Sequence, residues 1–433
     1  MAEDRWNHPP VVKGVFYDDF SEGIRGGVWR ALHEKWASQN NNGYSEDNCL
    51  YTTNAREVEK MGANGGIVVI RSNGDLSPQK ERKRQGGGIV TKRLFGPGLY
   101  EARMKVVPRV GQCSAIWTYF NDWAPAMEDR KYSEIDVEMP HGGDYRKFSG
   151  TTYENYVNAE QKISSSQVVD CPVPLNDGKW HVFAFEWRTD RENGDEGIVW
   201  YLDGKPVLTI REAVPHYTAT FWLASLFQDS PAWLGVPRFE TAYMYVDWVR
   251  ITEYADPCLP GFAEKESRLT YKGTDLQNAP IPKTDYIANG SFSRPARSED
   301  FKGNRIDSWE LDGGAQISEG VLRMQGKSRV TQTIEAQYAG FVFELCVDAE
   351  AAGEGRLEVY LESLSGKANT LEPVFREEGR SGKKICFTSG KRMKKRAAFR
   401  IEEKNTEHLR VVLETSEGTA ANVYGVHMNL QSE

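Results

Sequence analysis

Short runs rich in Val, Ile, Tyr, Trp and Phe alternate with Gly, Asp, Asn or Pro turns from Val15 to Tyr254, without long helical periodicity. In residues 180–187 (WHVFAFEW), three aromatic side chains occupy alternate positions, which is the period of a β-strand with two unlike faces. Asp203 and Gly204 lie between two such runs and are typical of a tight hairpin turn, which needs positive φ. The pattern predicts an antiparallel, all-β sandwich of the jelly-roll type or a barrel.

A second set of strand-like runs follows a segment that lacks apolar periodicity. Residues 257–285 carry four prolines among mixed polar residues, which is typical of a linker. Runs such as GFVFELCVDA and HLRVVLET then resume and suffice for a smaller β-sandwich. We therefore expect a first domain over residues 1–256, a linker over 257–285 and a second domain over 286–433.

Composition narrows the class of protein and of partner. Hydrophobic residues make up 39% of the chain and charged residues 27%, which excludes a disordered or collagen-like protein. The net charge of −8 argues against nucleic acid or anionic lipid as a partner, and no apolar run is long enough to span a membrane. The 12 Trp residues suit the apolar faces of sugar rings, although any one Trp is more often buried in a core. A neutral carbohydrate partner and a monomeric protein are the expectations.

The six cysteines show no zinc-like spacing and no CxxC pair. Cys346 and Cys386 both lie in apolar runs of the C-terminal part, where a disulfide bridge and two buried thiols are equally compatible with the sequence. The opening residues MAEDRW lack the apolar core of a signal peptide. We expect an extracellular or cell-envelope protein whose export signal lies outside the given sequence.

The segment YSEIDVEMPHG, residues 132–142, carries the candidate chemistry. Glu134, Asp136 and Glu138 alternate with Ile135 and Val137, so a strand here places three carboxyl groups on one sheet face. Like charges side by side on a strand destabilise it by up to about 1 kcal/mol per pair. The arrangement therefore needs a compensating role.

Three interpretations of these carboxyl groups stay open from the residues alone. A solvated strand face could carry acidic residues by chance, although Glu and Asp are poor strand formers. One calcium ion shared by Glu134 and Glu138 is difficult on a straight strand, because Cα atoms four residues apart lie roughly 13 Å apart. Glycoside hydrolysis with retention needs two carboxyl groups about 5 Å apart, which long Glu side chains on a curved strand can provide.

The run EIDVE resembles the ExDxE signature of glycoside hydrolase family 16, which includes lichenases, related β-glucanases and transglycosylases. Flanking stretches resemble the family in the same order, among them GGGIVTKRLFGPGLYEARMKVV before the motif and WHVFAFEW, WYLDGKPV and YVDWVRI after it. The resemblance covers roughly residues 15–254. It implies a β-jelly-roll with a concave substrate cleft, in which Glu134 is the nucleophile, Asp136 its helper and Glu138 the acid/base.

Several positions depart from the lichenase pattern. Tyr132 stands where lichenases have Trp, two residues before the nucleophile. Gly88 and Val90 stand where lichenases have a Glu-x-Arg pair, and Phe227 stands in place of a cleft Trp. Strict specificity for mixed-linkage glucan is therefore not implied.

Six residues are candidates for substrate contact. Some match cleft aromatics of the family, and His141 follows the carboxylate motif directly, although a surface role in the loop is the simpler interpretation of that histidine. The candidates are Tyr132, Tyr156, Phe227, Trp233, Trp117 and His141.

Two further features follow from the resemblance. Many members hold a structural calcium ion through the Asp of a final DW strand, and Asp247 is the matching residue here, so a stabilising calcium ion is an expectation. The C-terminal part, with NGSF at 289–292 and Trp309 beyond it, is similar to family 4 carbohydrate-binding modules. A sandwich that only supports the enzyme is an equal alternative.

Together these features predict a retaining endo-β-glycanase that cleaves internal linkages of a polysaccharide, with a β-glucan (1,3 or 1,3-1,4) as the first choice. No cofactor is expected for catalysis. The alternatives are an endo-β-galactanase or galactosidase, a transglycosylase, and a non-catalytic glycan-binding protein on the same fold.

Overall fold

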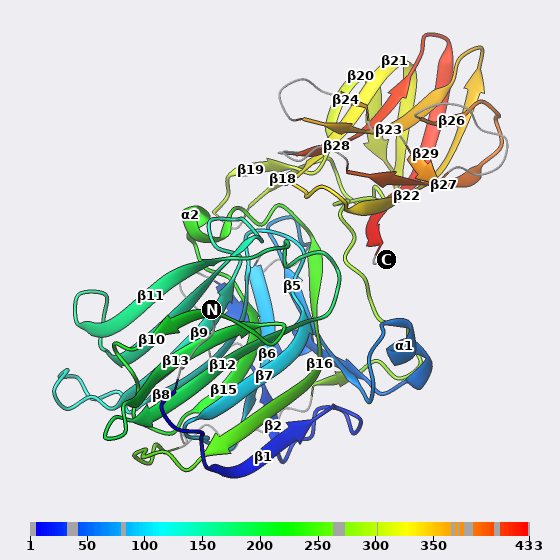
Figure 1. The fold of residues 1–433 in the computed structure, drawn as a ribbon. Coiled ribbons are helices and arrows are strands. Elements are labelled where there is room, and N and C mark those ends of the chain that lie inside the picture. The colour runs from blue at the N-terminus through cyan, green and yellow to red at the C-terminus, as the bar shows by residue number, and fades with distance from the viewer. Residues whose placement is uncertain are drawn as a thin grey trace. The chain divides into compact units, whose positions relative to one another are not determined.

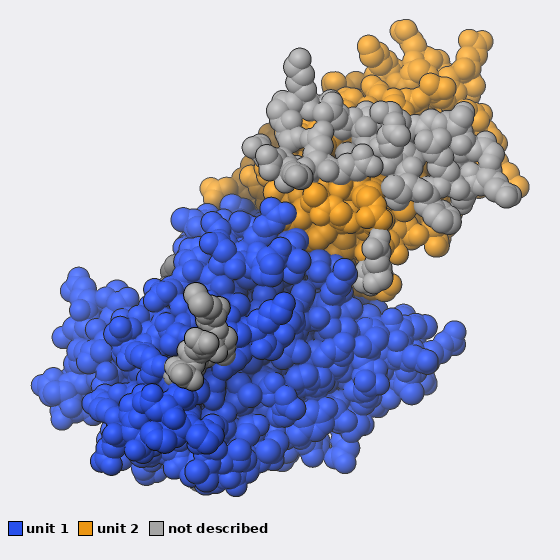
Figure 2. All heavy atoms as spheres, in the orientation of Figure 1, with its two compact units in different colours: residues 1–72, 84–236, 243–282 blue, residues 73–83, 237–242, 283–433 orange. Residues whose placement is uncertain are grey.

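The computed structural model describes residues 6–32, 42–78, 84–262, 273–300, 302–364, 369–370, 373–375, 384–401 and 408–431. Figure 1 shows that β-strands make up almost all of its regular structure. The chain divides into two compact units, coloured in Figure 2. The first unit comprises residues 1–72, 84–236 and 243–282, and the second comprises residues 73–83, 237–242 and 283–433.

The strands and helices up to residue 282 alternate with short turns. They are β1 (Val12–Asp18), β2 (Trp29–Ala31), β3 (Asn42–Tyr44), the 3-10 turn Glu46–Asn48, β4 (Cys49–Thr52), α1 (Ala55–Lys60), β5 (Ile67–Asn73), β6 (Arg84–Thr91), β7 (Gly98–Lys105), β8 (Cys113–Asn121), β9 (Tyr132–Met139), β10 (Lys147–Tyr156), β11 (Lys162–Asp170), β12 (His181–Asp190), β13 (Asp195–Leu202), β14 (Lys205–Ile210), β15 (Thr220–Leu226), α2 (Pro231–Leu234), β16 (Thr241–Tyr254) and β17 (Thr274–Asp275).

Two largely antiparallel layers form the first unit. One layer has the strand order β11-β10-β9-β8-β15-β6-β2, and the other contains β14-β13-β12-β7-β16-β1. Aromatic residues fill the space between them: the rings of Tyr100 and Phe185 stack at 4.8 Å, and Phe221 packs 5.5 Å from Tyr100. The all-β prediction is confirmed, and the predicted hairpin turn lies at Asp203, whose φ is +51°, and Gly204.

Strand β9 shows why the sequence alternates as it does. Ile135 and Val137 are buried against the second layer, where the burial of such side chains stabilises each by about 1.5–3 kcal/mol. The indole Nε1 of Trp200, on β13, donates to the backbone oxygen of Asp136 at 2.9 Å and so ties the two layers together. Because neighbouring side chains on a strand point to opposite faces, the three carboxyl groups lie on the face turned away from this core.

The segment predicted as a linker contributes to the first unit. Within it, β17 pairs in parallel with β4, and Ile281 is buried in a small apolar cluster. The hydroxyl of Tyr245 donates to the backbone oxygen of Pro282 at 2.6 Å. The segment before the unit boundary at residue 282 is therefore packed against the first unit. Its four prolines suggested a linker, and the sequence alone does not show these contacts.

The second unit is also a β-sandwich. Its strands are β18 (Arg297–Glu299), β19 (Arg305–Asp307), β20 (Glu310–Ser318), β21 (Val321–Ile334), β22 (Val342–Gly353), β23 (Leu357–Ser363), β24 (Asn369–Thr370), β25 (Pro373–Phe375), β26 (Ile385–Phe387), β27 (Met393–Arg400), β28 (Leu409–Thr415) and β29 (Thr419–Gln431). The main strand order is β24-β23-β28-β21-β29-β22-β27-β25, with β20 beside β21 and β26 beside β23.

Two short segments from earlier in the chain belong to this second unit. The backbone N–H of Leu76 donates to the oxygen of Phe239 at 3.1 Å, which joins the two segments. Arg294 donates to the backbone oxygen of Leu76 at 3.0 Å, and the N–H of Asn289 donates to the Glu240 carboxylate at 2.8 Å. The second unit is therefore not one continuous stretch of sequence.

The six cysteines are free thiols, so Cys346 and Cys386 do not form the bridge that the sequence left open. Within the described residues, no helix is long and apolar enough to cross a membrane.

Candidate active site

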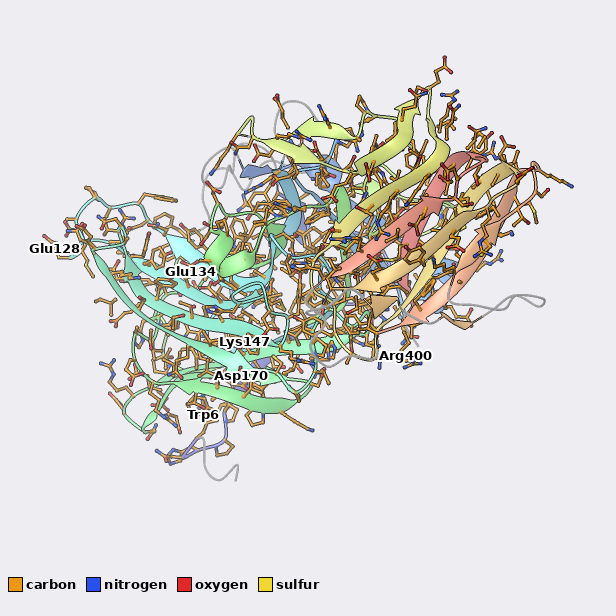
Figure 3. The ribbon with its side chains drawn as sticks, turned by 90° about the horizontal axis from the view of Figure 1, so that it is seen from above. Trp6, Glu128, Glu134, Lys147, Asp170 and Arg400 are labelled. Carbon is orange, nitrogen blue, oxygen red and sulfur yellow. The ribbon has the colours of Figure 1, made fainter. Side chains whose placement is uncertain are left out.

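The three carboxyl groups of β9 lie in the middle of a layer whose strand pairing sets their neighbours. On β8, Trp117 pairs with Asp136 and Tyr119 pairs with Glu134, so both rings lie on the carboxylate face. On the other side, Tyr153 of β10 pairs with Glu134. Figure 3 shows Glu134 on this layer, with Glu128 marking the loop between β8 and β9, and Lys147 and Asp170 marking one end of β10 and β11.

Glu134 is held by two hydroxyl-bearing groups. The phenol of Tyr132 donates a hydrogen bond to its Oε2, and Asp136 forms a second hydrogen bond to the same side chain. Burial raises the pKa of Glu134 to about 7, and both hydrogen bonds act in the opposite direction because they favour the ionised form. The two hydrogen bonds thus orient Glu134 and favour its ionised form.

Asp136 and Glu138 have higher proton affinities than their types usually show. Asp136 is 6% exposed, and burial followed by the charges of Glu134 and Glu138 raises its pKa well above the ordinary range. Burial and then the charge of Glu134 raise the pKa of Glu138 to about 8. Among the residues that the structure describes, no cationic side chain contributes to these three shifts. The arrangement favours one ionised carboxylate at Glu134 and a protonated acid at Glu138.

Tyr132, a predicted substrate contact, lies largely buried beneath the carboxylate face. The residue is 4% exposed, and its ring packs against Tyr119 at 5.7 Å and Tyr156 at 6.0 Å. The chemical feature that Tyr132 presents to the site is its hydroxyl, which donates to Glu134. A tryptophan at this position has no hydroxyl to donate.

The other predicted aromatic contacts divide into two groups. Trp117 and Trp233 are half-buried and pack against the same apolar cluster, and Tyr156 is half-buried beside Tyr132. Phe227 is 1% exposed, so its ring does not present a face to a ligand and the predicted sugar contact is not supported at this residue. His141 lies in the turn after β9, where its Nδ1 is 2.8 Å from the hydroxyl of Ser149, the residue that pairs with Glu138.

Gly88 and Val90, on β6, face an apolar part of the layer. Val90 is fully buried in a cluster with Leu32 and Ala224. A Cβ atom on Gly88 would lie 2.5 Å from the Cβ of Ala224, so the close approach of β6 and β15 requires glycine. These residues leave no polar contact in place of the Glu-x-Arg pair that lichenases carry.

Two aromatic residues on this face were not identified from the sequence. Trp222 of β15 pairs with Trp117, and their rings stack at 5.1 Å with an interplanar angle of 25°. Tyr119 packs edge-on against Trp222 at 6.0 Å. The sequence shows the alternation of these residues within β8 and β15, but it does not show that these two strands, about 100 residues apart, pair with each other.

The residues at Asp247 do not fit the calcium ion that the family resemblance implies. Asp247 is 1% exposed, and its Oδ2 accepts a hydrogen bond from the guanidinium of Arg103. Its Oδ1 accepts from the backbone N–H of Asn64 at 3.2 Å, and Arg103 also donates to the backbone oxygen of Gly62 at 3.3 Å. A guanidinium therefore lies between the carboxylate and the carbonyl that a cation would need. Among the described residues, no cluster of three or more His, Cys, Asp or Glu side chains offers another metal site.

The NGSF segment of the second unit is part of its core. Phe292 and Trp309 are buried and pack 5.5 Å apart, and Trp309 Nε1 donates to the backbone oxygen of Asn289 at 3.2 Å. Among the described residues of this unit, the large hydrophobic side chains that are exposed are Leu311 and Met393, neither of which is aromatic. The motif that suggested sugar binding is therefore explained by folding.

Most of the first unit matches a known protein family. Residues 43–248 match the family model described as glycosyl hydrolases family 16. The match contains the complete carboxylate strand β9 and the strands that pair with it.

Curated relatives agree with this match. The β-glucanase of Bacillus subtilis is 26% identical over 243 residues, which cover 55% of this chain and 87% of that protein. The endo-1,3-1,4-β-glycanase ExoK of Rhizobium meliloti is 27% identical over 247 residues, covering 56% of this chain and 80% of the relative. The solved β-glucanase of Bacillus licheniformis superposes with a TM-score of 0.44 at 23% identity, covering 55% of this chain and 98% of that one.

Proposed function

Because the chain contains a glycoside hydrolase family 16 domain at residues 43–248, we propose that it is a retaining endo-β-glycanase acting on a β-glucan with 1,3 or mixed 1,3-1,4 linkages. The observation that carries the proposal is the state of the two outer carboxyl groups on β9. Hydrogen bonds from Tyr132 and Asp136 favour the ionised form of Glu134, which suits a nucleophile, whereas burial and the charge of Glu134 raise the pKa of Glu138, which suits an acid.

The first step uses both groups at once. Glu138 donates its proton to the glycosidic oxygen while a carboxylate oxygen of Glu134 attacks the anomeric carbon, which breaks the glycosidic bond and forms a glycosyl ester. The leaving sugar departs as a neutral alcohol. In the second step the ionised Glu138 removes a proton from water, the water oxygen attacks the same carbon, and Glu134 leaves as a carboxylate.

Hydrogen bonds from its neighbours favour the role of Glu134 in both steps. The Tyr132 hydroxyl and the protonated Asp136 donate to the carboxylate, which favours the ionised nucleophile before attack and stabilises it as leaving group afterwards. Asp136 serves as a donor because its own pKa is raised well above the ordinary range. The named activities of the β-glucanase and ExoK relatives support a β-glucan as substrate.

Product analysis tests the proposal directly. The protein is incubated with barley mixed-linkage glucan, laminarin, agarose and carrageenan, and products are separated by chromatography, with the anomeric configuration followed by NMR. We expect β-configured oligosaccharides from one of the two glucans. Products longer than the starting chains would indicate a transglycosylase, and products from agarose or carrageenan a galactanase.

The variants separate catalysis from binding. Glu134→Gln is expected to abolish products while the folded protein still binds the polysaccharide in a native affinity gel. Glu186→Gln is the matched control, because Glu186 likewise accepts from tyrosine hydroxyls, Tyr201 at 2.6 Å and Tyr254 at 3.1 Å, but belongs to the other layer. If no polysaccharide is cleaved by the wild-type protein while one retards it in the gel, a glycan-binding function replaces the proposal.

A further inference from the structure

A histidine in the turn after β9 is hydrogen-bonded to a residue beside Glu138. The Nδ1 atom of His141 lies 2.8 Å from the hydroxyl oxygen of Ser149, and Ser149 pairs directly with Glu138. A serine hydroxyl has one proton to donate. We propose that the Glu138 carboxylate and the His141 imidazole compete for the Ser149 hydroxyl, so that His141 is a positioning residue for the acid/base. The proposal rests on the proposed function and adds to it a residue that acts through Ser149.

The pairing of β9 with β10 brings the serine beside the glutamate. Directly opposite residues share a sheet face, with Cβ atoms about 4.5–5.5 Å apart, so the hydroxyl of Ser149 is within reach of the long side chain of Glu138. Ser149 is 5% exposed, so water has little access to its hydroxyl. A change of acceptor from the imidazole to the carboxylate therefore requires rotation of side chains and no change in the strands.

The turn between β9 and β10 holds the histidine in place. The backbone N–H of His141 donates to the oxygen of Lys147 at 3.0 Å, and the N–H of Asp144 donates to the oxygen of His141 at 3.0 Å. Gly142 and Gly143 lie within this turn with φ values of +62° and +70°, which glycine adopts without strain. The backbone of the histidine is therefore fixed on both sides, and its ring is half-buried.

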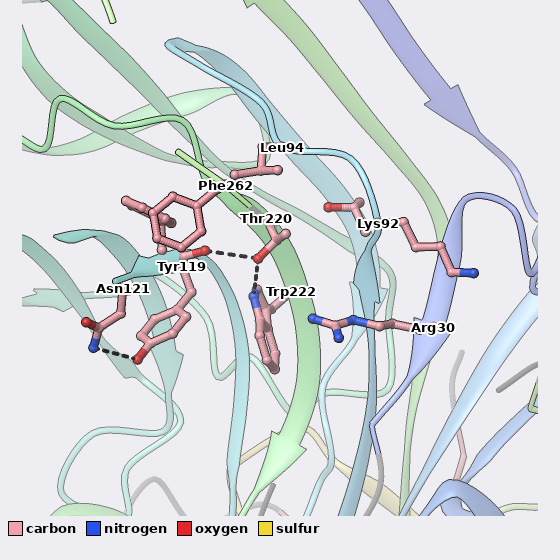
Figure 4. A pocket seen from close by; sticks show the side chains of 10 residues that line it. Arg30, Lys92, Leu94, Tyr119, Asn121, Thr220, Trp222 and Phe262 are labelled. Atoms are coloured by element: carbon pink, nitrogen blue, oxygen red, sulfur yellow. Dashed lines mark hydrogen bonds between the residues drawn. The ribbon is translucent and has the colours of Figure 1, made fainter. Parts of the chain in front are cut away.

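On β8, the residue opposite Glu138 offers no hydrogen bond from its side chain. It is Ala115, which contributes a methyl group. The row of Glu134 differs, because its partner on β8 is Tyr119, whose hydroxyl accepts from Asn121 at 3.2 Å, as a dashed line in Figure 4 shows. Burial and the charge of Glu134 raise the pKa of Glu138, and no hydrogen bond from a described residue lowers it. The serine on β10 is therefore the paired neighbour that can donate to the carboxylate.

The imidazole can release the serine proton without leaving its place. When Nδ1 carries a proton, it donates to the Ser149 oxygen, and the serine O–H is available to the carboxylate. That state suits the step in which Glu138 is ionised, whereas an accepting Nδ1 suits the step in which Glu138 is the acid. The other titratable or charged groups on the neighbouring elements are Glu134 and Asp136 on β9, Tyr153 on β10, Cys113 on β8, and Asp144, Arg146 and Lys147 in the turn and at the start of β10.

Two variants should move the titration of Glu138 in opposite directions. His141→Phe keeps a ring but removes the competing acceptor, so the ionised carboxylate gains the serine and the titration should move down by about one pH unit. Ser149→Ala removes the donor, so the titration should move up by about one pH unit. A residue that only packs in the turn would not produce shifts of opposite sign.

Two measurements follow this titration. The first is the basic limb of kcat/KM against pH on the glucan that is cleaved, because this limb reports the acid of the free enzyme. The second does not depend on activity: a ¹³C NMR titration of protein labelled at the carboxyl carbons of glutamate, in which the signal missing from Glu138→Gln assigns the residue.

Further variants separate this competition from a loss of packing. Ser149→Thr keeps the hydroxyl and should restore the wild-type titration. The double variant His141→Phe with Ser149→Ala should behave as Ser149→Ala does, because the histidine acts through the serine. Ser166→Ala is the matched control: it removes one hydroxyl of the pair formed by Thr151 and Ser166, 2.9 Å apart on the same layer, and should leave the titration unchanged. His141→Leu provides the same test if His141→Phe does not fold.

The proposal is overturned if the folded variants of His141 and Ser149 shift the titration of Glu138 in the same direction, or if either leaves it at the wild-type value. Circular dichroism establishes that each variant is folded. If the wild type cleaves no polysaccharide, the proposed function fails on its own, and the NMR titration still decides whether the carboxylate and the imidazole share one hydroxyl.

Discussion

Carboxyl groups lie on β-strands both in β9 and in the second unit, but the side chains that hydrogen-bond to them differ. In the second unit, Glu362 of β23 accepts two hydrogen bonds from Arg329, at 2.9 and 3.0 Å. Asp348 of β22 is held in the same way by Arg392, at 2.8 Å. On β9, by contrast, the hydrogen bonds to Glu134 come from Tyr132 and Asp136.

The difference shows what distinguishes a structural acid from a reactive one. The hydrogen bond from Arg392 lowers the pKa of Asp348, so that group stays ionised and its charge is neutralised by its partner. Burial raises the pKa values of Glu134 and Glu138 to about 7 and about 8, and no cationic side chain of the described residues offsets it. A carboxyl group must be able to exchange its proton near the working pH to serve as an acid and a base, and the raised pKa values of the β9 pair meet that condition, whereas the lowered pKa of Asp348 does not.

The largest expected effect is a loss of catalysis when a carboxyl group of β9 is replaced, but not when one of the second unit is. Glu138→Gln should lower kcat/KM on polysaccharide by about 1,000-fold or more, because the leaving sugar is no longer protonated. An aryl β-glycoside whose phenol needs no protonation should lose far less in the first step, measured as a burst of phenol. Glu362→Gln should leave kcat/KM within about 2-fold of wild type. Equal losses on both substrates would contradict the acid role of Glu138.

The next effect concerns the tyrosine that replaces the lichenase tryptophan. Tyr132→Phe removes a hydrogen bond to an ionised group, worth about 1.5–3 kcal/mol, so kcat/KM should fall about 10- to 100-fold. That hydrogen bond lowers the pKa of Glu134, so the acidic limb of the pH–rate profile should move to higher pH in the variant. Circular dichroism controls for folding, and a lower rate with an unmoved acidic limb would leave Tyr132 a packing role only.

The two kinds of carboxyl group should also respond oppositely to pH in stability measurements. The pKa of Glu138 rises from an ordinary 4.5 to about 8 on folding, so the folded state binds this proton more tightly than the unfolded chain does. The stabilisation is present below pH 4.5 and is lost as the pH rises toward 8. Glu138→Gln should therefore be more stable than wild type by roughly 1–3 kcal/mol at about pH 9, and nearly equal at about pH 4.

Asp348 supplies the opposite sign. Its folded-state pKa is lowered, so its contribution is present above the ordinary pKa of 3.8 and is lost as the pH falls through the lower folded value. Since Arg392 is more than half exposed, Asp348→Asn should cost at most about 0.5 kcal/mol at neutral pH and nothing at low pH. Urea titration of both variants across this pH range is the measurement, and shifts of the same sign would contradict the comparison.

The smallest expected effect belongs to a paired carboxylate inside the first unit. Because Arg103 neutralises Asp247, addition of a chelator or of excess calcium should shift the thermal midpoint by less than about 1 °C. The variant Arg103→Met, which removes the guanidinium from the carboxylate but keeps an unbranched apolar side chain, should be less stable and should gain stability from calcium. A midpoint of the wild type that rises with calcium would show a cation site that the Asp247 contacts do not describe.

The sequence was sufficient for features that depend on neighbours along the chain. Alternation in β9 predicted that Glu134, Asp136 and Glu138 share a face, and strand periodicity predicted two all-β units. It was not sufficient where contacts join distant segments: the partnership of Trp117 with Trp222 depends on how β8 pairs with β15. Phe227 was assigned to the cleft by analogy, whereas its burial depends on packing after β15 that no local pattern reveals.

The chain order of the second unit has a consequence for dissecting the gene. Leu76 and Glu240, which receive hydrogen bonds from Arg294 and Asn289, are encoded far upstream of residue 283. A fragment that begins at residue 283 therefore lacks two pieces of its own fold, and a fragment that ends there carries two pieces without their partners. Shuffling of this C-terminal module between proteins would require transplanting three stretches of coding sequence together.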